Sequence, residues 1–227
     1  MKKITILDYT TKAPLNLIGL MAGICWSSDI SKNDKNIKRA LKCIEDGHGR
    51  VEEFPDVYMI IEGFSAKCLR ELYTHIGGSP TRLQASTRYI DYSKGFEAVV
   101  PHSVEKNSEA LKIWNEAISN ISTAMNKLKE LNVPTEDLTN LLPLAYESKM
   151  VWKVNLRTLI NFMEMRLCSR AYWEIRELSQ LIKKELSNYS NEWKQLCELF
   201  VPKCKQVGYC TESKSCGLMP KKNNKKS

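Results

Sequence analysis

Polar and apolar positions alternate along this chain in two different rhythms. Positions 56–64 alternate at every second residue and are rich in aromatic and β-branched side chains, which predicts a strand. Short extended segments are also predicted over 3–7 and 150–154. Apolar spacings of three and four predict helices, which are expected at 36–45, 65–73, 103–131, from 134 onward, 157–187 and 192–200.

Local signals mark the ends of several of these elements. Ser65 is suited to cap the helix over 65–73, because its hydroxyl can accept a hydrogen bond from the first turn. The sequence Gly77-Gly78-Ser79-Pro80 must interrupt any helix, and Pro134 fits the first turn of the next one. Strands and helices together predict an α+β fold in which the helices over 103–131 and 157–187 supply most of the core.

The composition is that of a globular protein with a basic bias. The chain has 227 residues, of which 43% are hydrophobic, enough for a packed core. Its apolar stretches are too short and broken for a membrane span, and the N-terminus lacks the pattern of a signal peptide, so we expect a cytoplasmic protein. The formal charge of +8 lies partly in the tail over 221–227, which is expected to be disordered. The remaining bias suits anionic small molecules, whereas the chain lacks the basic and aromatic module of a nucleic-acid binder.

The segment 84–89 carries the first candidate chemistry. It follows the Gly-Gly-Ser-Pro break and reads Gln84-Ala85-Ser86-Thr87-Arg88-Tyr89. Backbone N–H groups, hydroxyls and a guanidinium crowded on one turn can bind the oxygens of a phosphate. The alternative is a polar turn with a capping hydroxyl and a surface arginine.

The segment 155–166 carries the second set of residues with candidate chemistry. Arg157 and Asn161 are four residues apart and therefore share one helix face, whereas Leu159, Phe162 and Met163 lie on another face and are expected in the core. Polar groups on so apolar a helix need a partner, which is either a second helix or a ligand.

Taken in order, these segments resemble the flavin-dependent thymidylate synthase family. The signature loop of that family ends in Glu-x-Ser-x-Arg-Tyr, which the segment 84–89 matches apart from its first residue. A later helix of the family begins Asn-x-Arg-Ser-Leu-x-Asn-Phe and continues to an arginine and Trp-Glu-Ile. This chain has Asn155-Leu156-Arg157-Thr158-Leu159-Ile160-Asn161-Phe162, then Arg166, then Trp173-Glu174-Ile175. The similarity is collinear from about residue 4 to about residue 190, with Leu142-Pro143-Leu144, 22–26 and Gly47-His48 also in place.

The resemblance implies a fold, a reaction and a set of site residues. The implied fold is a central antiparallel sheet with long helices over residues 1–190, followed by a cysteine-containing extension over 191–220. The implied reaction is reductive methylation of dUMP to dTMP with FAD, methylene-tetrahydrofolate and NADPH, in a homotetramer whose sites lie between subunits. By resemblance, FAD is held by Asn155, Arg157, Asn161 and His75; the dUMP phosphate and sugar by Gln84, Ala85, Ser86, Thr87 and Arg88; and the uracil edge by Arg166, the catalytic candidate.

The chain also departs from the family pattern. The hallmark Arg-His-Arg falls near Tyr73-Thr74-His75, so both of its arginines are missing, and Thr139 stands where the family has another arginine. Arg82 or Arg70 could supply a missing charge. His75 is then either a flavin contact or a loop histidine. The departures keep open C5 alkylation of a different pyrimidine nucleotide, or a non-catalytic nucleotide-binding protein on the same fold.

The eight cysteines fall into two sets. Four lie in segments that look helical or buried and are expected to act as small buried hydrophobes: Cys25, Cys43, Cys68 and Cys168. The other four are separated by six, five and five residues, beyond the reach of the resemblance: Cys197, Cys204, Cys210 and Cys216. Because the close pair of a usual zinc signature is absent, three alternatives stay open for them: one structural Zn²⁺, two disulfides, or free thiols.

Overall fold

A four-stranded antiparallel sheet forms the centre of the fold. The computed structural model describes residues 1–77 and 80–222. The strands are β1 (Lys3–Ile6), β2 (Asp56–Ser65), β3 (Thr81–Gln84) and β4 (Glu147–Asn155), in the order β1-β2-β4-β3. Buried and less buried residues alternate along β2 and β4, so one face of each strand meets the core. The predicted α+β class is confirmed.

The chain divides into two compact units, each assembled from distant segments. The α7 unit comprises Ile4–Ile60, Thr74–Arg82 and the chain from Trp152 onward. The α5 unit comprises Met1–Lys3, Ile61–Tyr73 and Leu83–Val151. One boundary falls inside each of the four strands and another follows α3, so neither unit is a continuous stretch of sequence.

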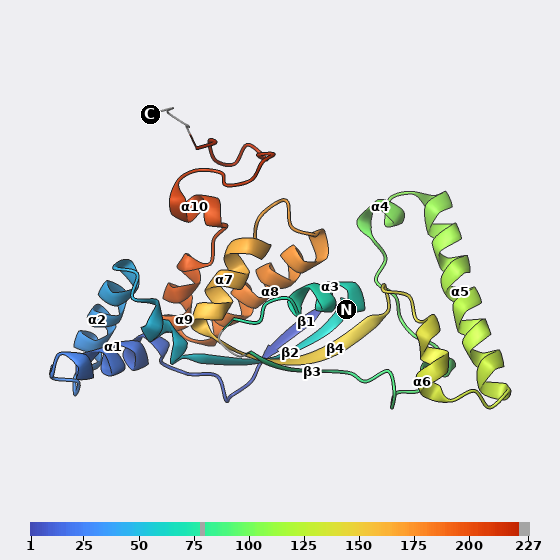
Figure 1. Cartoon of the computed structure of the whole chain (residues 1–227), viewed down its shortest axis with the longest axis horizontal. Coiled ribbons are helices and arrows are strands. Elements are labelled where there is room, and N and C mark those ends of the chain that lie inside the picture. The colour runs from blue at the N-terminus through green and yellow to red at the C-terminus, as the bar shows by residue number, and fades with distance from the viewer. Residues whose placement is uncertain (78–79, 223–227) are drawn as a thin grey trace. The chain divides into compact units, whose positions relative to one another are not determined.

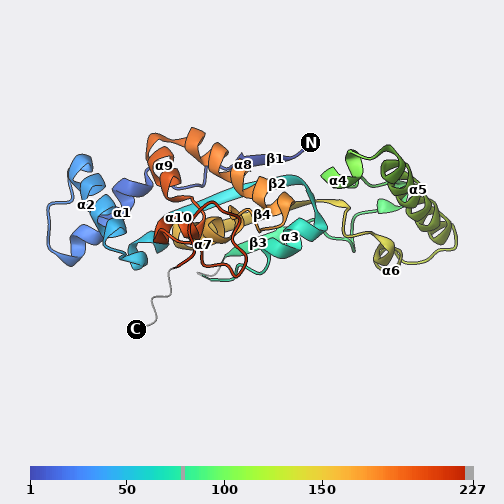
Figure 2. The ribbon, with the colours of Figure 1, turned by 90° about the horizontal axis from the view of Figure 1, so that it is seen from above.

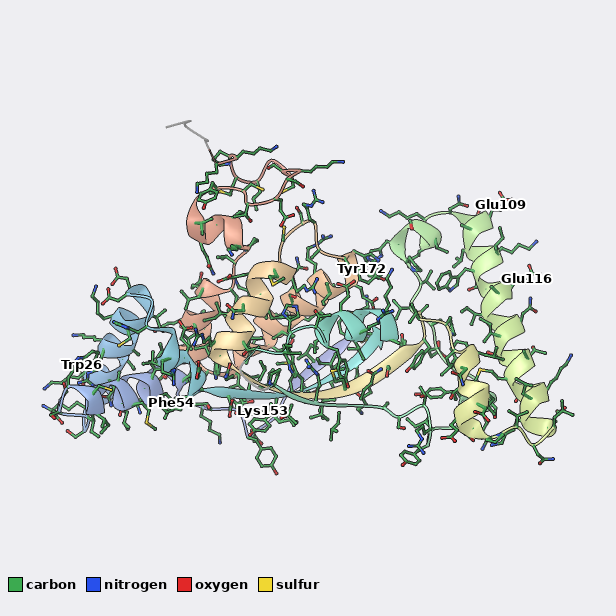
Figure 3. All side chains as sticks on the ribbon, in the orientation of Figure 1. Trp26, Phe54, Glu109, Glu116, Lys153 and Tyr172 are labelled. Carbon is green, nitrogen blue, oxygen red and sulfur yellow. The ribbon has the colours of Figure 1, made fainter. Side chains whose placement is uncertain are left out.

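In the α7 unit, helices α7 (Leu156–Arg166) and α8 (Trp173–Tyr189) pack side by side over one face of the sheet (Figures 1 and 2). Trp152 of β4 meets Phe162 of α7 edge to face, with ring centroids 5.3 Å apart. Lys153, next along β4, points to the opposite face (Figure 3), where its ammonium lies 2.8 Å from the carboxylate of Asp56. The strand therefore presents its apolar residues to the helices and its charged residue away from them.

The remaining helices of the α7 unit are α1 (Pro14–Cys25), α2 (Asn33–Glu45), α9 (Asn191–Leu196) and α10 (Lys203–Val207), with 3-10 turns at Gly49–Glu53 and Cys197–Leu199. α1, which the sequence analysis did not predict, packs closely on α2. A Cβ at Gly19 would lie 1.8 Å from the carbonyl oxygen of Asn36, so this contact needs glycine.

In the α5 unit, the elements are α3 (Ala66–Leu72), α4 (His102–Glu105), α5 (Ser108–Glu130) and α6 (Thr135–Leu138), with 3-10 turns at Tyr92–Lys94 and Thr139–Leu141. The predicted cap is confirmed, since the Ser65 hydroxyl accepts a hydrogen bond from the Cys68 amide at 3.1 Å. α5 contributes little to the core, because Met125 is its one buried residue in the described chain. The prediction that two long helices supply most of the core is therefore wrong for the first of them.

Both predicted long helices are interrupted. The first divides into α4 and α5 at Asn107, whose side chain accepts hydrogen bonds from the amides of Glu109 and Ala110 and so caps α5. The second ends at Arg166 and resumes at Trp173. Arg176 stabilises this break by donating to the carbonyl oxygens of Ser169 and Ala171 at 2.8 and 3.2 Å. The predicted helix over 192–200 likewise ends at Leu196 and continues as a 3-10 turn.

Two sequence expectations fall partly outside the described residues. Gly78 and Ser79, the middle of the predicted helix break, lie there, as do residues 223–227 of the predicted disordered tail. Within 1–77 and 80–222, none of the helices combines the length and hydrophobicity that a membrane span requires.

Candidate functional site

Arg166 lies at the C-terminal end of α7 and is held by two residues of the segment 74–77. Its Nε donates a hydrogen bond to Nε2 of His75 at 2.9 Å, and its Nη2 donates to the Thr74 hydroxyl at 3.3 Å. A second contact fixes the same segment to α7, since the Thr158 hydroxyl donates to the carbonyl oxygen of Gly77 at 2.5 Å. The guanidinium is therefore oriented by contacts that the sequence pattern did not reveal.

His75 is buried and uncharged at neutral pH. Its ring meets Phe162 edge to face with centroids 4.9 Å apart, and 9% of the residue is exposed. Burial, and then the charges of Arg166 and Arg82, lower its pKa from 6.5 to about 4. Because Nε2 accepts from Arg166, the neutral ring must carry its proton on Nδ1. The structure thus places His75 as a neutral acceptor for Arg166.

The burial of His75 predicts a pH-dependent stability. The unfolded chain binds a proton at this histidine below pH 6.5, whereas the folded chain resists protonation down to about pH 4. Stability is therefore fully present above pH 6.5 and is lost as the pH falls toward 4, by about 2 kcal/mol at pH 5. Urea unfolding at pH 7 and pH 5 should show that the His75→Gln variant loses less unfolding free energy between these pH values than the unchanged protein does.

The matched control for this prediction is His102→Gln, because His102 is exposed on α4. Its acid-induced loss of stability should equal that of the unchanged protein. An equal loss in the His75→Gln variant would show that His75 is not the buried neutral group described here.

The start of α7 carries the other predicted residues of the second segment. Asn155 is 7% exposed and caps the helix, because its Oδ1 accepts from the Thr158 amide at 2.9 Å. Arg157 and Asn161 lie on one exposed face, as predicted, and Leu159, Phe162 and Met163 are buried, also as predicted. The side chain of Asn161 has no hydrogen-bond partner within residues 1–77 and 80–222.

Arg157 has a defined setting on that face. Its Nη1 pairs with Glu53 Oε1 at 2.5 Å, and a Cβ at Gly49 would lie 3.3 Å from its Nε. Burial raises the pKa of the Glu52 carboxyl above its usual value. The charge of Arg157 opposes this shift, and the charge of Glu164 adds to it. The face therefore combines a half-exposed cation, an unpartnered amide and a close glycine backbone.

The predicted phosphate segment belongs to the α5 unit and begins as a strand rather than a loop. Gln84 is the last residue of β3, and its Nε2 donates to the Ser148 hydroxyl at 3.1 Å. The Ser86 hydroxyl accepts from the Arg88 amide at 3.2 Å, so a polar turn follows. The guanidinium of Arg88 lies 2.9 Å from Glu136, and both side chains are more than half exposed.

Thr139, which stands where the family has an arginine, has a structural role in this chain. Thr139 is buried, and its hydroxyl donates to the carbonyl oxygens of Thr87 and Glu136 at 3.0 and 3.2 Å. It therefore ties the turn after β3 to the end of α6. The predicted site residues consequently form two sets: 84–88 in the α5 unit, and His75 with 155–166 in the α7 unit.

The four cysteines that the zinc alternative groups together do not come together in the structure. Cys197 is buried in the 3-10 turn after α9, where its thiol donates to the Lys183 carbonyl at 3.5 Å, so packing separates it from the other three. Among the residues that the structure describes, no three His, Cys, Asp or Glu side chains are grouped to hold a metal ion. The expected buried role is correct for Cys43 and Cys68 and wrong for Cys25, which is exposed, and Cys168, which is half-buried.

Comparison with known proteins agrees with the fold and the motifs. The family model described as "Thymidylate synthase complementing protein" matches residues 5–189. The flavin-dependent thymidylate synthase of Pyrococcus horikoshii is 34% identical, over 97% of this chain and 93% of its own length. That of Pyrococcus furiosus is 33% identical, over 100% and 96%. The chain therefore belongs to the flavin-dependent thymidylate synthase family.

Solved structures share the fold at lower identity. The Thymidylate Synthase X of Helicobacter pylori, crystallised with FAD and dUMP, aligns with a TM-score of 0.66 at 19% identity, over 87% of this chain and 100% of its own. The UMP/dUMP methylase PolB of Streptomyces cacaoi, bound with 5-Br dUMP, aligns with a TM-score of 0.72 at 13% identity, over 86% and 94%. The full coverage by the Pyrococcus furiosus relative also extends the similarity into the C-terminal segment, which the motif comparison had left outside it.

Proposed function

We propose that this protein makes dTMP from dUMP, with FAD as its cofactor, methylene-tetrahydrofolate as the carbon donor and NADPH as the reductant. The observation that carries the proposal is Arg166, a permanent cation oriented by a neutral buried histidine at the end of α7. Residues 1–190 form the catalytic domain in this proposal. The two Pyrococcus relatives are named for the same activity.

The exposed face of α7 fits a flavin dinucleotide. Arg157 offers a half-exposed guanidinium, and Asn161 offers an amide whose donors and acceptor are unused within the described chain. A charged and hydrogen-bonding face of this kind suits a pyrophosphate or the polar edge of a flavin ring. Asn155 supports this face as the helix cap, and His75 acts through Arg166. FAD, once bound and reduced, supplies the hydride for the methylation.

Arg166 is proposed to face the uracil edge of dUMP. A guanidinium beside N3 and O2 favours loss of the N3 proton, and the resulting negative charge makes C5 more nucleophilic. Because His75 engages Nε and Thr74 engages Nη2, the plane of the Arg166 guanidinium is held in one orientation. A planar fork can span two adjacent ring atoms, which a lysine ammonium cannot do.

The turn after β3 is proposed to hold the phosphate and sugar of dUMP. The supporting residues are the Ser86 and Thr87 hydroxyls and the Arg88 guanidinium, with Gln84 and Ala85 at the end of the strand. The pair between Arg88 and Glu136 is exposed, and such pairs contribute little, so a phosphate can replace the carboxylate at small cost.

Titration of the purified protein with FAD tests the cofactor assignment. The flavin absorbance should change on binding and saturate at one FAD per site, and Asn161→Ala should weaken the binding. Met165→Ala is the matched control, because Met165 is exposed on the same helix and should leave FAD affinity unchanged. Binding of dUMP without any FAD binding would instead favour a nucleotide-binding protein that has lost catalysis.

A second candidate, alkylation at C5 of a different pyrimidine nucleotide, is favoured by the departures at Tyr73, His75 and Thr139. These positions lack the family arginines, so the polar surroundings of the nucleotide differ. Parallel assays with dUMP and UMP separate the two candidates, and faster methylation of UMP would replace the first by the second.

Assembly into a homotetramer is proposed from α5. This 23-residue helix carries an apolar stripe that its own unit covers incompletely: Leu111, Trp114, Ile118, Ile121 and Leu128 are half-buried, and Ile113 beside them is 63% exposed. An amphipathic helix with one buried residue gains stability by packing against another subunit.

Replacing Ile113 with Asp should therefore weaken the assembly, because a carboxylate would be desolvated in the interface. Glu116→Ala is the control, since Glu116 is exposed on the same helix (Figure 3). Sedimentation velocity should show smaller species for the first variant and an unchanged tetramer for the second. A stable monomer of the unchanged protein that still binds FAD would contradict the proposal.

A further inference from the structure

A cavity of about 340 Å³ beside the end of α7 is lined by four thiols that the proposed function does not use. Cys168 comes from the connection between α7 and α8, Cys204 from α10, and Cys210 and Cys216 from the C-terminal loop. Figures 1 and 2 both show this loop over the end of α7. Cysteines more than 30 residues apart in sequence therefore meet at one place, whereas Cys197 is buried elsewhere.

The C-terminal loop has little hydrophobic packing of its own. None of the residues over 201–222 is buried. Polar contacts tie it to the α7–α8 connection: Arg170 donates to the Lys214 carbonyl at 2.9 Å and lies 3.5 Å from Glu212. Exposed polar contacts contribute little stability. Segments that lack a core are commonly fastened by covalent or metal cross-links, and the converging thiols offer such a link.

Two of the thiols differ in reactivity. Cys216 is exposed, and the Ser169 hydroxyl, followed by the Leu218 amide, lowers its pKa. Cys204 is half-buried, and burial together with the neighbouring thiols raises its pKa. An accessible thiol that ionises readily, next to a second thiol, is the arrangement found at oxidation-sensitive cysteine pairs.

We propose that Cys216 and Cys204, facing one cavity, form a reversible disulfide that closes the C-terminal loop onto α10. With a peroxide as oxidant, the Cys216 thiolate attacks one oxygen, the O–O bond breaks, and water leaves after protonation. The sulfenic acid on Cys216 is then attacked by the Cys204 thiol, which forms the S–S bond and releases a second water. Two thiols give up two electrons to one hydrogen peroxide, and a dithiol reductant reverses the step.

Mild oxidation of the full-length protein tests this pair. The reduced protein is treated with hydrogen peroxide, blocked with a maleimide and analysed by intact mass and peptide mapping. The expected product lacks two hydrogens and contains the peptide joined through Cys204 and Cys216. Cys204→Ser should stop at a sulfenic acid that dimedone traps on Cys216, and Cys216→Ser should slow the reaction about tenfold or more.

The control is Cys25→Ser, because Cys25 is exposed but lies outside the cavity, and its oxidation should match that of the unchanged protein. Equal labelling of Cys25 and Cys216, or a disulfide through Cys168 or Cys210 instead, would overturn the assignment. One zinc per chain that protects these thiols would overturn it as well. None of these readouts depends on turnover, so the outcome is separate from that of the proposed activity.

Discussion

Replacing Arg166 with alanine is expected to slow dTMP formation about a hundredfold or more in a single turnover, because the charge acts on the pyrimidine as it becomes anionic. An interaction that is stronger in the transition state lowers the barrier, whereas uniform binding does not. FAD binding should persist, since Arg157 and Asn161 lie on a separate face of α7. The measurement is rapid-quench dTMP formation alongside a flavin titration.

Arg166→Lys is the matched variant. Lysine keeps the charge but loses both the fork and the Nε donor that meets His75, so it should restore the rate only in part. Near-normal turnover of the alanine variant would remove Arg166 from the mechanism. Loss of FAD together with turnover would instead mark the residue as structural.

The second large effect is expected at Phe162, whose replacement by alanine should lower the free energy of unfolding by about 3–5 kcal/mol. The ring is fully buried and meets both Trp152 and His75 edge to face. Its removal leaves a cavity beneath the histidine that orients Arg166. Turnover by the folded fraction should therefore fall as well, which urea unfolding and activity measured on one preparation can show.

Met165→Ala controls for a general effect on α7, because Met165 is 57% exposed on the same helix. Its unfolding free energy should change by less than about 0.5 kcal/mol, as is usual for exposed positions. A Phe162→Ala variant as stable as the Met165→Ala variant would show that the core around β4 and α7 is packed differently.

The strands β1, β2 and β4 and the apolar face of α7 were predictable from local pattern, whereas β3 was not. Period-two alternation identified β2, and spacing of three and four placed Leu159 and Phe162 in the core. The interruption at 167–172 was not predictable, because the helical spacing continues across it. Arg176 stabilises this interruption by donating to two backbone carbonyls, a contact that exists only in the folded structure.

The motif residues of the site were predictable from the sequence, but the residues that orient them were not. Family motifs pointed to Arg166, yet nothing in the pattern indicated that His75, 91 residues earlier, accepts its hydrogen bond. The zinc alternative for the four C-terminal cysteines is not met for a related reason. Even spacing grouped Cys197 with the tail, whereas packing buries it and brings Cys168 to the other three. Spacing identifies neighbours along the chain, whereas the fold creates both the contact of His75 with Arg166 and the grouping of Cys168 with the three C-terminal cysteines.

Anaerobic single turnover tests the central claim most directly. Protein carrying reduced FAD is mixed with dUMP and methylene-tetrahydrofolate, and flavin oxidation and dTMP are followed in the same sample. We predict that each flavin oxidised yields one dTMP, and that omission of dUMP or of the folate prevents dTMP formation. Flavin that binds and is reduced but yields no dTMP, with both substrates saturating, would contradict the account.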